Sequence, residues 1–412
     1  MEIGRSISLL ALISLFVAAA AGQQSAWEFF GSETISASIA LRGDREAGFA
    51  SITRLGLESL PASGPGFRAE GSLSWSLGGE SSLARAFAAG LASAPSRAEL
   101  PPGADLHRTI ALDQAWARFS LGALDAKFGL IPLSWGSGYA FNPLGLATPP
   151  TFPGMESDTA EGRFGATASL SLLSFLSLEA YVLAESRLRS PVPSIGEVEL
   201  RAFPFGLRAV ARLEEIDFAF AFGRSRMSID ADPEWFAGAD ATGFLGPVTL
   251  YAEAAARVLV ADGDTFRALD PARDIDACAG LSFLMPILET TLRAEGAWLG
   301  RGSEDSAAYD RASLIAGTRA TLGKAYALAL AEKETDDRFK AGAGALWNLF
   351  DASAAWLARA TWCPIPSLEL GIDCILYAGD ASSEFGGTLP TGPGRSWDPF
   401  VPSLAISAKA SF

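Results

Sequence analysis

The sequence is poor in the side chains that most often build catalytic and metal centres. It contains one histidine, His107, and three cysteines, Cys278, Cys363 and Cys374, in 412 residues. These counts exclude a metal cluster made of histidine and cysteine ligands. The sequence also has no phosphate-binding loop or dinucleotide fingerprint. We therefore expect no metal and no cofactor.

Charge is scarce as well, and positive charge especially so. Charged residues form 19% of the chain, and 47 acidic residues outnumber 32 basic ones, which gives a net charge of −15. The phosphate backbone of a nucleic acid needs a basic surface, so this balance argues against a nucleic-acid partner. It also makes an anionic membrane surface an unfavourable docking site.

Long apolar runs are missing beyond the N-terminal segment, although 49% of the residues are hydrophobic. Without a run of about eighteen apolar residues, transmembrane helices are excluded. The apolar residues alternate with polar ones instead, as in 67–77, where Phe67, Leu73 and Trp75 oppose Arg68 and Glu70. This period of two predicts strands with one apolar and one polar face.

The alternation recurs along the chain with turn residues between the segments. We expect strands at 35–41, 67–77, 124–130, 164–172, 178–184, 207–213, 216–222, 248–258, 292–298, 314–322, 339–347, 352–362 and 368–376. Short turns at 121–123, 173–175, 214–215, 245–247, 285–287 and 323–324 alternate with long connections rich in Gly, Pro, Asp and Ser, such as 78–108, 133–160 and 379–402. Such a pattern is typical of an all-β protein, a transmembrane antiparallel β-barrel with short periplasmic turns and long extracellular loops.

The number of strands needs a choice, because all the candidate segments together give about nineteen. A closed bacterial barrel with both ends on one side has an even number. We take 338–362 as one long or bent strand instead of two, which leads to about 18 strands, with 16 as the next choice. Strands and loops then use the whole chain and leave no room for another domain.

The N-terminal segment has the pattern of an export signal. Residues 7–21 form an apolar run that is too short for a comfortable membrane span, and Ala19, Ala20, Ala21 and Gly22 supply the small residues of a cleavage site. We expect a signal peptide at 1–22 and one barrel domain at 23–412.

The C-terminus agrees with this destination. In 403–412 the apolar residues Leu404, Ile406, Ala408 and Ala410 alternate with polar ones, and the chain ends on Phe412. This ending resembles the C-terminal strand of bacterial outer-membrane β-barrel proteins. The resemblance implies location in the outer membrane, contact with its lipid, and recognition of Phe412 by the barrel-assembly machinery. With the short turns at the same end, both termini are expected in the periplasm.

One internal segment, AKFGLIPLSWGSGYAFNPLGLATPPTFPG at 126–154, is more specific. Its Lys127, Gly129, Trp135-Gly136 and Asn142-Pro143 resemble a pattern of porin-like outer-membrane barrels. Glycine and proline favour an ordered loop. We expect the loop near 133–160 to fold into the lumen and to line a solute path with Trp135, Tyr139, Phe141 and Asn142. A loop that only caps or plugs the barrel is the alternative.

Charged residues fall on the phase opposite to the apolar face. Because a charge facing lipid costs about 2–4 kcal/mol at mid-membrane, we place these side chains in the lumen. They include Arg68, Glu70, Lys127, Arg163, Arg208, Arg257, Arg293, Glu295, Arg319 and Arg359. They either create a transverse field that selects polar solutes or neutralise one another.

These features predict a porin-like channel for passive diffusion of small polar solutes, which is not an enzyme. The first alternative is a non-conducting barrel that binds ligands or serves a structural role through its loops. The second is an outer-membrane lipid hydrolase that uses His107 beside a serine. A disulfide between Cys363 and Cys374 is left open by the sequence.

Overall fold

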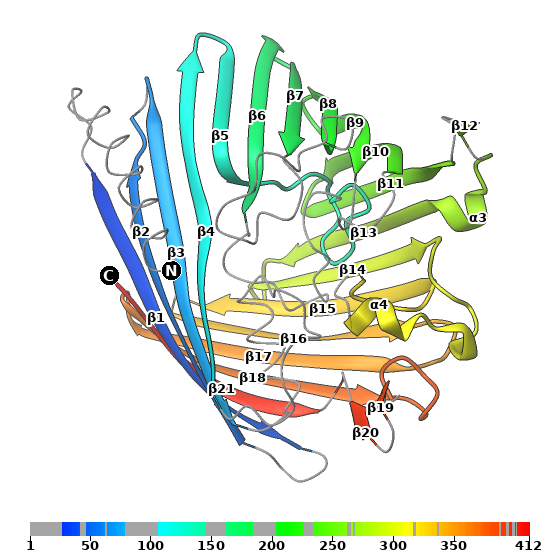
Figure 1. The fold of residues 1–412 in the computed structure, drawn as a ribbon. Helices are drawn as coiled ribbons and strands as arrows, with labels where there is room; N and C mark the ends of the chain where they lie inside the picture. Colours follow the sequence, from blue (N-terminus) through cyan, green and yellow to red (C-terminus); the bar gives the residue numbers. More distant parts are fainter. Residues whose placement is uncertain are drawn as a thin grey trace.

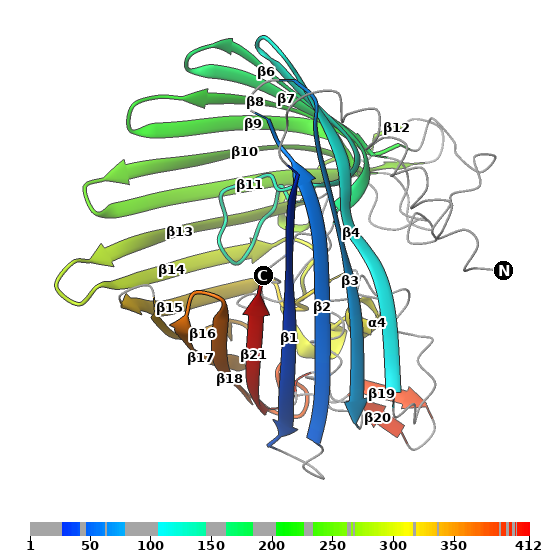
Figure 2. The ribbon, with the colours of Figure 1, turned by 90° about the vertical axis from the view of Figure 1, so that its left-hand side faces the viewer.

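Figures 1 and 2 show a single closed β-barrel, seen in a computed structural model of the chain. The structure describes residues 27–41, 47–61, 64–78, 106–145, 162–183, 203–225, 234–261, 265–266, 268–315, 319–335, 338–386, 389–392, 395–397, 400 and 402–412. The expected signal peptide at 1–22 lies outside these residues, as does the part 146–160 of the predicted inward loop.

Eighteen antiparallel strands form the barrel wall, as the sequence predicts. They are β1 (Glu28–Ala40), β2 (Ala47–Ser59), β3 (Gly66–Gly78), β4 (Leu106–Leu121), β5 (Leu124–Pro132), β6 (Gly162–Leu173), β7 (Leu176–Leu183), β8 (Phe205–Arg212), β9 (Ile216–Ser225), β10 (Glu234–Leu245), β11 (Val248–Ala261), β13 (Ile275–Met285), β14 (Thr290–Leu299), β15 (Ala325–Thr335), β16 (Phe339–Asn348), β17 (Ala354–Ile365), β18 (Leu368–Ala378) and β21 (Ser403–Ser411).

The barrel closes where the last strand meets the first. β21 pairs antiparallel with β1 from Ser32–Ser411 to Ala40–Ser403, and its other edge pairs with β18. Backbone hydrogen bonds between Gly31 and Phe412 extend this seam to the end of the chain. The eighteen described strands of the wall therefore all pair on both sides, and the wall offers no free edge for pairing with other chains.

Six short elements among the described residues belong to the connections and are not part of the barrel wall. They are β12 (Thr265–Phe266), β19 (Leu389–Gly392), β20 (Arg395–Trp397), α3 (Pro271–Asp274), the 3-10 turn η5 (Ser306–Ala308) and α4 (Arg311–Ile315). In the part of the chain that the structure describes, no helix is long and apolar enough to span a membrane.

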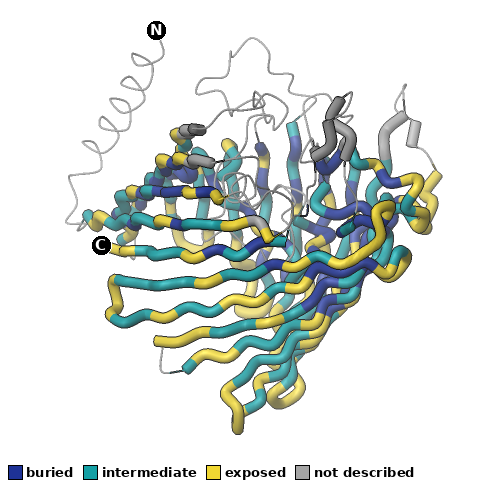
Figure 3. The backbone as a smooth tube through the Cα atoms, turned by 90° about the horizontal axis from the view of Figure 1, so that it is seen from below, coloured by how far each residue is buried: buried dark blue, intermediate teal, exposed yellow. Residues whose placement is uncertain are grey.

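Alternation along the strands separates an outer face from the lumen. Large apolar side chains such as Ile35, Phe128, Phe220 and Ile372 are exposed on the outside. Polar side chains such as Ser36 occupy the positions between them and are buried. Figure 3 shows exposed and less exposed residues alternating along many strands. An apolar outer belt of this kind suits contact with lipid.

The predicted strand at 314–322 is wrong. Its first residues, Leu314 and Ile315, end helix α4, and the described remainder continues as irregular backbone into β15. Leu314 and Leu322 are buried in a cluster with Phe141 and Tyr326, which explains why apolar residues recur there. The expected turn at 323–324 is therefore part of one long connection, 300–324.

The treatment of 338–362 as one strand is also wrong. The segment holds β16 and β17, joined by a tight connection at 349–353. The surplus candidate was 314–322, so the total of eighteen is confirmed although the wrong segment was removed. The short turns, the start of β1 and the end of β21 lie at one end of the barrel, and 349–353 lies at the other.

Candidate functional site

The segment 133–145, which follows β5, lies inside the barrel. It contacts the inner faces of strands that are more than 100 residues away in sequence. Figures 1 and 2 show this cyan loop beside β11 and β13 in both views. We call residues 133–145 the inner loop.

Two lumen-facing carboxylates bind the backbone of the inner loop. Glu253 of β11 accepts hydrogen bonds from the backbone N–H groups of Ser137 at 2.7 Å and Gly138 at 3.0 Å, and from that of Leu144. Hydrogen bonds to an ionised carboxylate are stronger than bonds between neutral groups. Glu253 therefore fixes both ends of the turn that the loop makes.

Glu295 of β14 binds the backbone of the middle of the loop in the same way. It accepts from the backbone N–H groups of Tyr139 at 2.7 Å, Ala140 at 3.2 Å and Phe141 at 2.8 Å. The Tyr251 hydroxyl donates to the same carboxylate at 2.7 Å. Two side chains thus accept hydrogen bonds from six backbone N–H groups of an irregular segment. The segment can therefore fold inside the barrel without pairing with the strands of the wall.

Two glycines make this close approach possible. Gly136 has a φ of +101°, a conformation that L-residues rarely adopt, and a Cβ there would collide with the carboxylate of Glu253. A Cβ on Gly138 would collide with the carbonyl oxygen of Phe141 and approach the Cys278 sulfur. The Trp-Gly-Ser-Gly sequence is therefore required by the docking of the loop.

Aromatic side chains of the inner loop pack on the wall at two places. Trp135, 9% exposed, lies 4.7 Å from Tyr181 between ring centroids, in a cluster with Leu144 and Phe236. Phe141, 7% exposed, stacks on Tyr326 at 5.3 Å. Tyr139 is half-buried and Asn142 is exposed. The structure thus brings the four predicted residues into the barrel, two of them buried against it.

The predicted lumen charges fall into two groups. Arg68, Glu70, Lys127, Arg163, Arg208, Arg257, Arg293, Glu295 and Arg359 lie in barrel strands on the phase opposite to the exposed apolar residues. Arg319 does not lie in a strand, because the expected strand at 314–322 does not exist. Its guanidinium donates to the backbone oxygen of Arg301 within the connection 300–324.

Several of these charges pair with an opposite charge on the same strand or on another strand. Arg68 contacts Glu58 at 3.0 Å and Glu70 at 2.9 Å, and Arg208 contacts Asp240 at 2.9 Å and Glu179 at 3.5 Å. Further pairs are Arg257–Asp276, Arg293–Glu332 and Arg359–Asp373. Lys127 lies 4.7 Å above the ring of Trp116. Much of the lumen charge is therefore balanced by an adjacent partner.

A second hydrogen-bond network lies at the loop-bearing end of the barrel, around Glu384. This side chain, 2% exposed, accepts from the backbone of Leu322 at 2.8 Å, from Asn348 Nδ2 at 2.7 Å and from the Tyr326 hydroxyl. Burial raises the pKa of the Glu384 carboxyl to about 7, against the opposing effect of these hydrogen bonds. Sequence patterns give no sign of this network, because 379–402 reads only as a long loop.

The remaining candidates are His107 and the three cysteines, of which Cys278 donates a hydrogen bond from its sulfur to the backbone oxygen of Phe141 in the inner loop, at 3.1 Å. His107 lies near the start of β4, with its backbone in register with Ser76 of β3. All three cysteines are free, so the disulfide left open by the sequence is not formed. Among the described residues, no group of three or more His, Cys, Asp or Glu side chains could hold a metal ion.

No family model and no curated protein sequence matches this chain. Solved structures do resemble it. OpdL of Pseudomonas aeruginosa aligns with a TM-score of 0.53 and 10% identity over 94% of this chain and 98% of that one. OccK5 (OpdH) of the same organism has a TM-score of 0.51 and 11% identity over 93% and 98%. OccAB4 of Acinetobacter baumannii has a TM-score of 0.51 and 10% identity over 94% and 99%. At such low identity the likeness shows the fold, a closed antiparallel barrel of 18 strands like that of outer-membrane porins.

Proposed function

We propose that this protein is an outer-membrane channel through which small polar solutes diffuse passively. The observation that carries the proposal is the inner loop, a segment held inside a closed barrel by Glu253 and Glu295. A loop that is bound to one side of the wall narrows the lumen without needing to seal it. The porin-like fold is consistent with this function.

Within this channel the four predicted loop residues divide their roles. Trp135 and Phe141 are buried and hold the loop to the wall. Tyr139 and Asn142 are accessible and line the path of the solute. Polar side chains and backbone groups along a narrow path replace part of a solute's hydration, which allows passage and gives selectivity.

The proposal includes the direction of the barrel in the membrane. The short turns and both termini face the periplasm, and the exposed apolar belt contacts lipid. Phe412, 70% exposed at the end of β21, is then available to the barrel-assembly machinery. We expect deletion of Phe412 to lower the level of assembled protein in the outer membrane of cells more than it weakens protein refolded in detergent. Equal surface levels with and without Phe412 would argue against this role.

Conductance of the refolded full chain in planar bilayers tests the channel. We expect discrete single-channel steps for the natural protein. In the double variant Glu253→Ala, Glu295→Ala the loop loses its charge-assisted hydrogen bonds, each worth about 1.5–3 kcal/mol, and conductance should rise and become noisier. Asp125→Ala is the matched control, because Asp125 of β5 contacts Arg118 and Ser120 and not the inner loop.

The outcome separates the channel from a non-conducting barrel. A folded natural protein without conductance, in which the double variant also stays silent, supports a binding or structural role. Mobility of unheated and heated samples on a detergent gel shows that each variant is folded before it is measured.

A further inference from the structure

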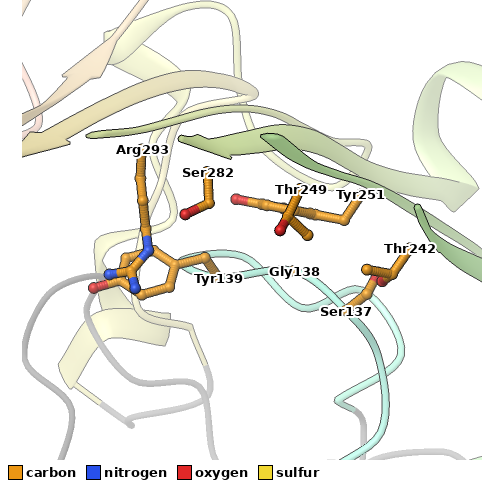
Figure 4. A pocket seen from close by; sticks show the side chains of 8 residues that line it. All are labelled: Ser137, Gly138, Tyr139, Thr242, Thr249, Tyr251, Ser282 and Arg293. Atoms are coloured by element: carbon orange, nitrogen blue, oxygen red, sulfur yellow. The ribbon is translucent and has the colours of Figure 1, made fainter. Parts of the chain in front are cut away.

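A polar pocket lies between the inner loop and the barrel wall. Its volume is about 380 Å³. As Figure 4 shows, Ser137, Gly138 and Tyr139 of the inner loop form one side, and Thr249, Tyr251 and Ser282 come from the strands on the other. The volume falls at the small end of the roughly 300–1,000 Å³ found for small-molecule sites.

Hydroxyl groups dominate the wall side of this pocket. Thr242 of β10, Thr249 of β11 and Ser282 of β13 are all partly exposed there. Thr249 and Ser282 are directly opposite in the sheet, and Thr242 is opposite Tyr251. Within the described part of the chain, no side-chain hydrogen bond occupies the hydroxyls of Thr242, Thr249 or Ser282. Each can donate one hydrogen bond and accept others.

The charged groups next to these hydroxyls are already engaged. Arg293, the cation of the pocket, pairs with Glu332, and its guanidinium lies 4.5 Å above the ring of Tyr139. The carboxylate of Glu295 binds three backbone N–H groups of the inner loop and the Tyr251 hydroxyl. The charge of Arg293 is therefore offset by Glu332 and that of Glu295 by four hydrogen bonds, so each attracts an ion less strongly than an unpaired charge would.

These facts restrict the chemistry of a ligand. An anion would compete with Glu332 for Arg293, and a cation would compete with the inner loop for Glu295. An apolar molecule would remove water from several hydroxyls and offer no hydrogen bond in return. A molecule with several hydroxyl groups and no charge meets the unoccupied donors and acceptors directly.

We propose that this pocket is a binding site for uncharged polyhydroxylated solutes, that is, sugars or sugar alcohols. The proposal rests on the channel function and names the class of solute for which the channel has a site. Because the unoccupied hydrogen-bonding groups of the pocket are neutral hydroxyls, binding is weak enough for the solute to leave again, as transport requires.

The test uses the refolded full chain in planar bilayers with D-glucitol as the probe. Binding should reduce the ion current in a saturable manner as glucitol is raised. Tetraethylene glycol, which is similar in size but carries hydroxyls only at its ends, should reduce the current only in proportion to its concentration. Thr249→Val and Ser282→Ala should each raise the half-saturating glucitol concentration about 2- to 10-fold, since each removes one neutral hydrogen bond.

Thr167→Val is the matched control. Thr167 lies on the lumen phase of β6, outside the pocket, so its loss should leave the glucitol concentration dependence unchanged. D-gluconate has the same carbon skeleton with a carboxylate at one end, and it should bind less well than glucitol. Tighter binding of gluconate, equal effects of Thr167→Val and Thr249→Val, or a purely linear effect of glucitol would each overturn the proposal.

Equilibrium dialysis of labelled glucitol against detergent-refolded protein separates this proposal from the channel itself. Absence of conductance refutes the proposed function. Absence of saturable glucitol binding in dialysis refutes the pocket assignment, whether or not the protein conducts.

Discussion

At the scale of single residues, the two carboxylates that bind the inner loop show what a sequence can and cannot reveal. Alternation along β11 and β14 places Glu253 and Glu295 on the lumen face. Their partners are backbone N–H groups 109 to 156 residues away, which carry no side-chain signal. The direction of a side chain follows from local periodicity, whereas its partner depends on where a distant loop folds.

Glu384 offers a pH-dependent test at the same scale. The groups around it are Tyr326, Asn348, Tyr309, Asp351 and Arg319, and burial raises its pKa to about 7. In the unfolded segment the carboxyl has its ordinary pKa near 4.5. The folded network therefore binds the proton more tightly, and its stability should increase as pH falls from about 7 to about 4.5. Linkage gives an effect on the order of 3 kcal/mol.

Amide hydrogen exchange of Leu322 and Gly323, corrected for the intrinsic effect of pH, measures this stability. Both N–H groups donate to Glu384, so their protection should rise on acidification. Glu384→Gln should abolish the dependence on pH in this window. Loss of protection on acidification would mean that hydrogen bonds to the carboxylate outweigh the cost of its burial.

At the scale of secondary-structure elements, the surroundings of β15 explain why the sequence wrongly predicts a strand at 314–322. Its lumen-phase residues include Tyr326 and Leu328, which are buried under the inner loop and the connection 300–324, so one face of the strand is not polar. The alternation in 314–322 does not reflect a strand. Leu314 and Leu322, at its two ends, are apolar because both pack into the same buried cluster. Period-two patterns identify strands well only where one face meets water and the other meets lipid.

β17 allows the outer face to be tested with one charge. Ala358 is exposed between Trp356 and Ala360 on the outer phase, whereas Leu357 is on the lumen phase. Ala358→Arg should lower the free energy of unfolding by about 2–4 kcal/mol in lipid vesicles, because the guanidinium would face hydrocarbon. Leu357→Arg is the neighbouring control and should cost much less. Ala354 is a poorer site because it is only 5% exposed. Denaturant titration that gave equal losses for the two variants would contradict the assigned faces.

At the scale of the whole molecule, the sequence predicts a closed barrel of eighteen strands because the same features recur along most of the chain. Alternation, short turns at one end and an apolar C-terminal strand all belong to the same architecture, so errors at single segments hardly affect it. The site is different, since its geometry depends on one loop folding back onto strands far along the chain. The sequence motif predicts that the loop enters the lumen, while the side of the wall it contacts and the pocket beneath it appear only in three dimensions.

The pairing of lumen charges leads to a prediction for the complete channel. Although the net charge of the chain is −15, Arg68, Arg208 and Arg359 each contact an acidic partner, so a passing ion meets little unbalanced charge from them. We expect weak selectivity between potassium and chloride.

One unpaired charge about 4 Å from an ion in water is worth about 1 kcal/mol, a factor of about five in occupancy. Asp240→Asn leaves Arg208 with only Glu179, at the longer distance of 3.5 Å, and should shift permeability toward chloride by up to that factor. The reversal potential in a potassium chloride gradient measures both effects. Strong selectivity in the natural protein would show that unpaired charges control the path, and an unchanged potential in Asp240→Asn would place Arg208 away from it.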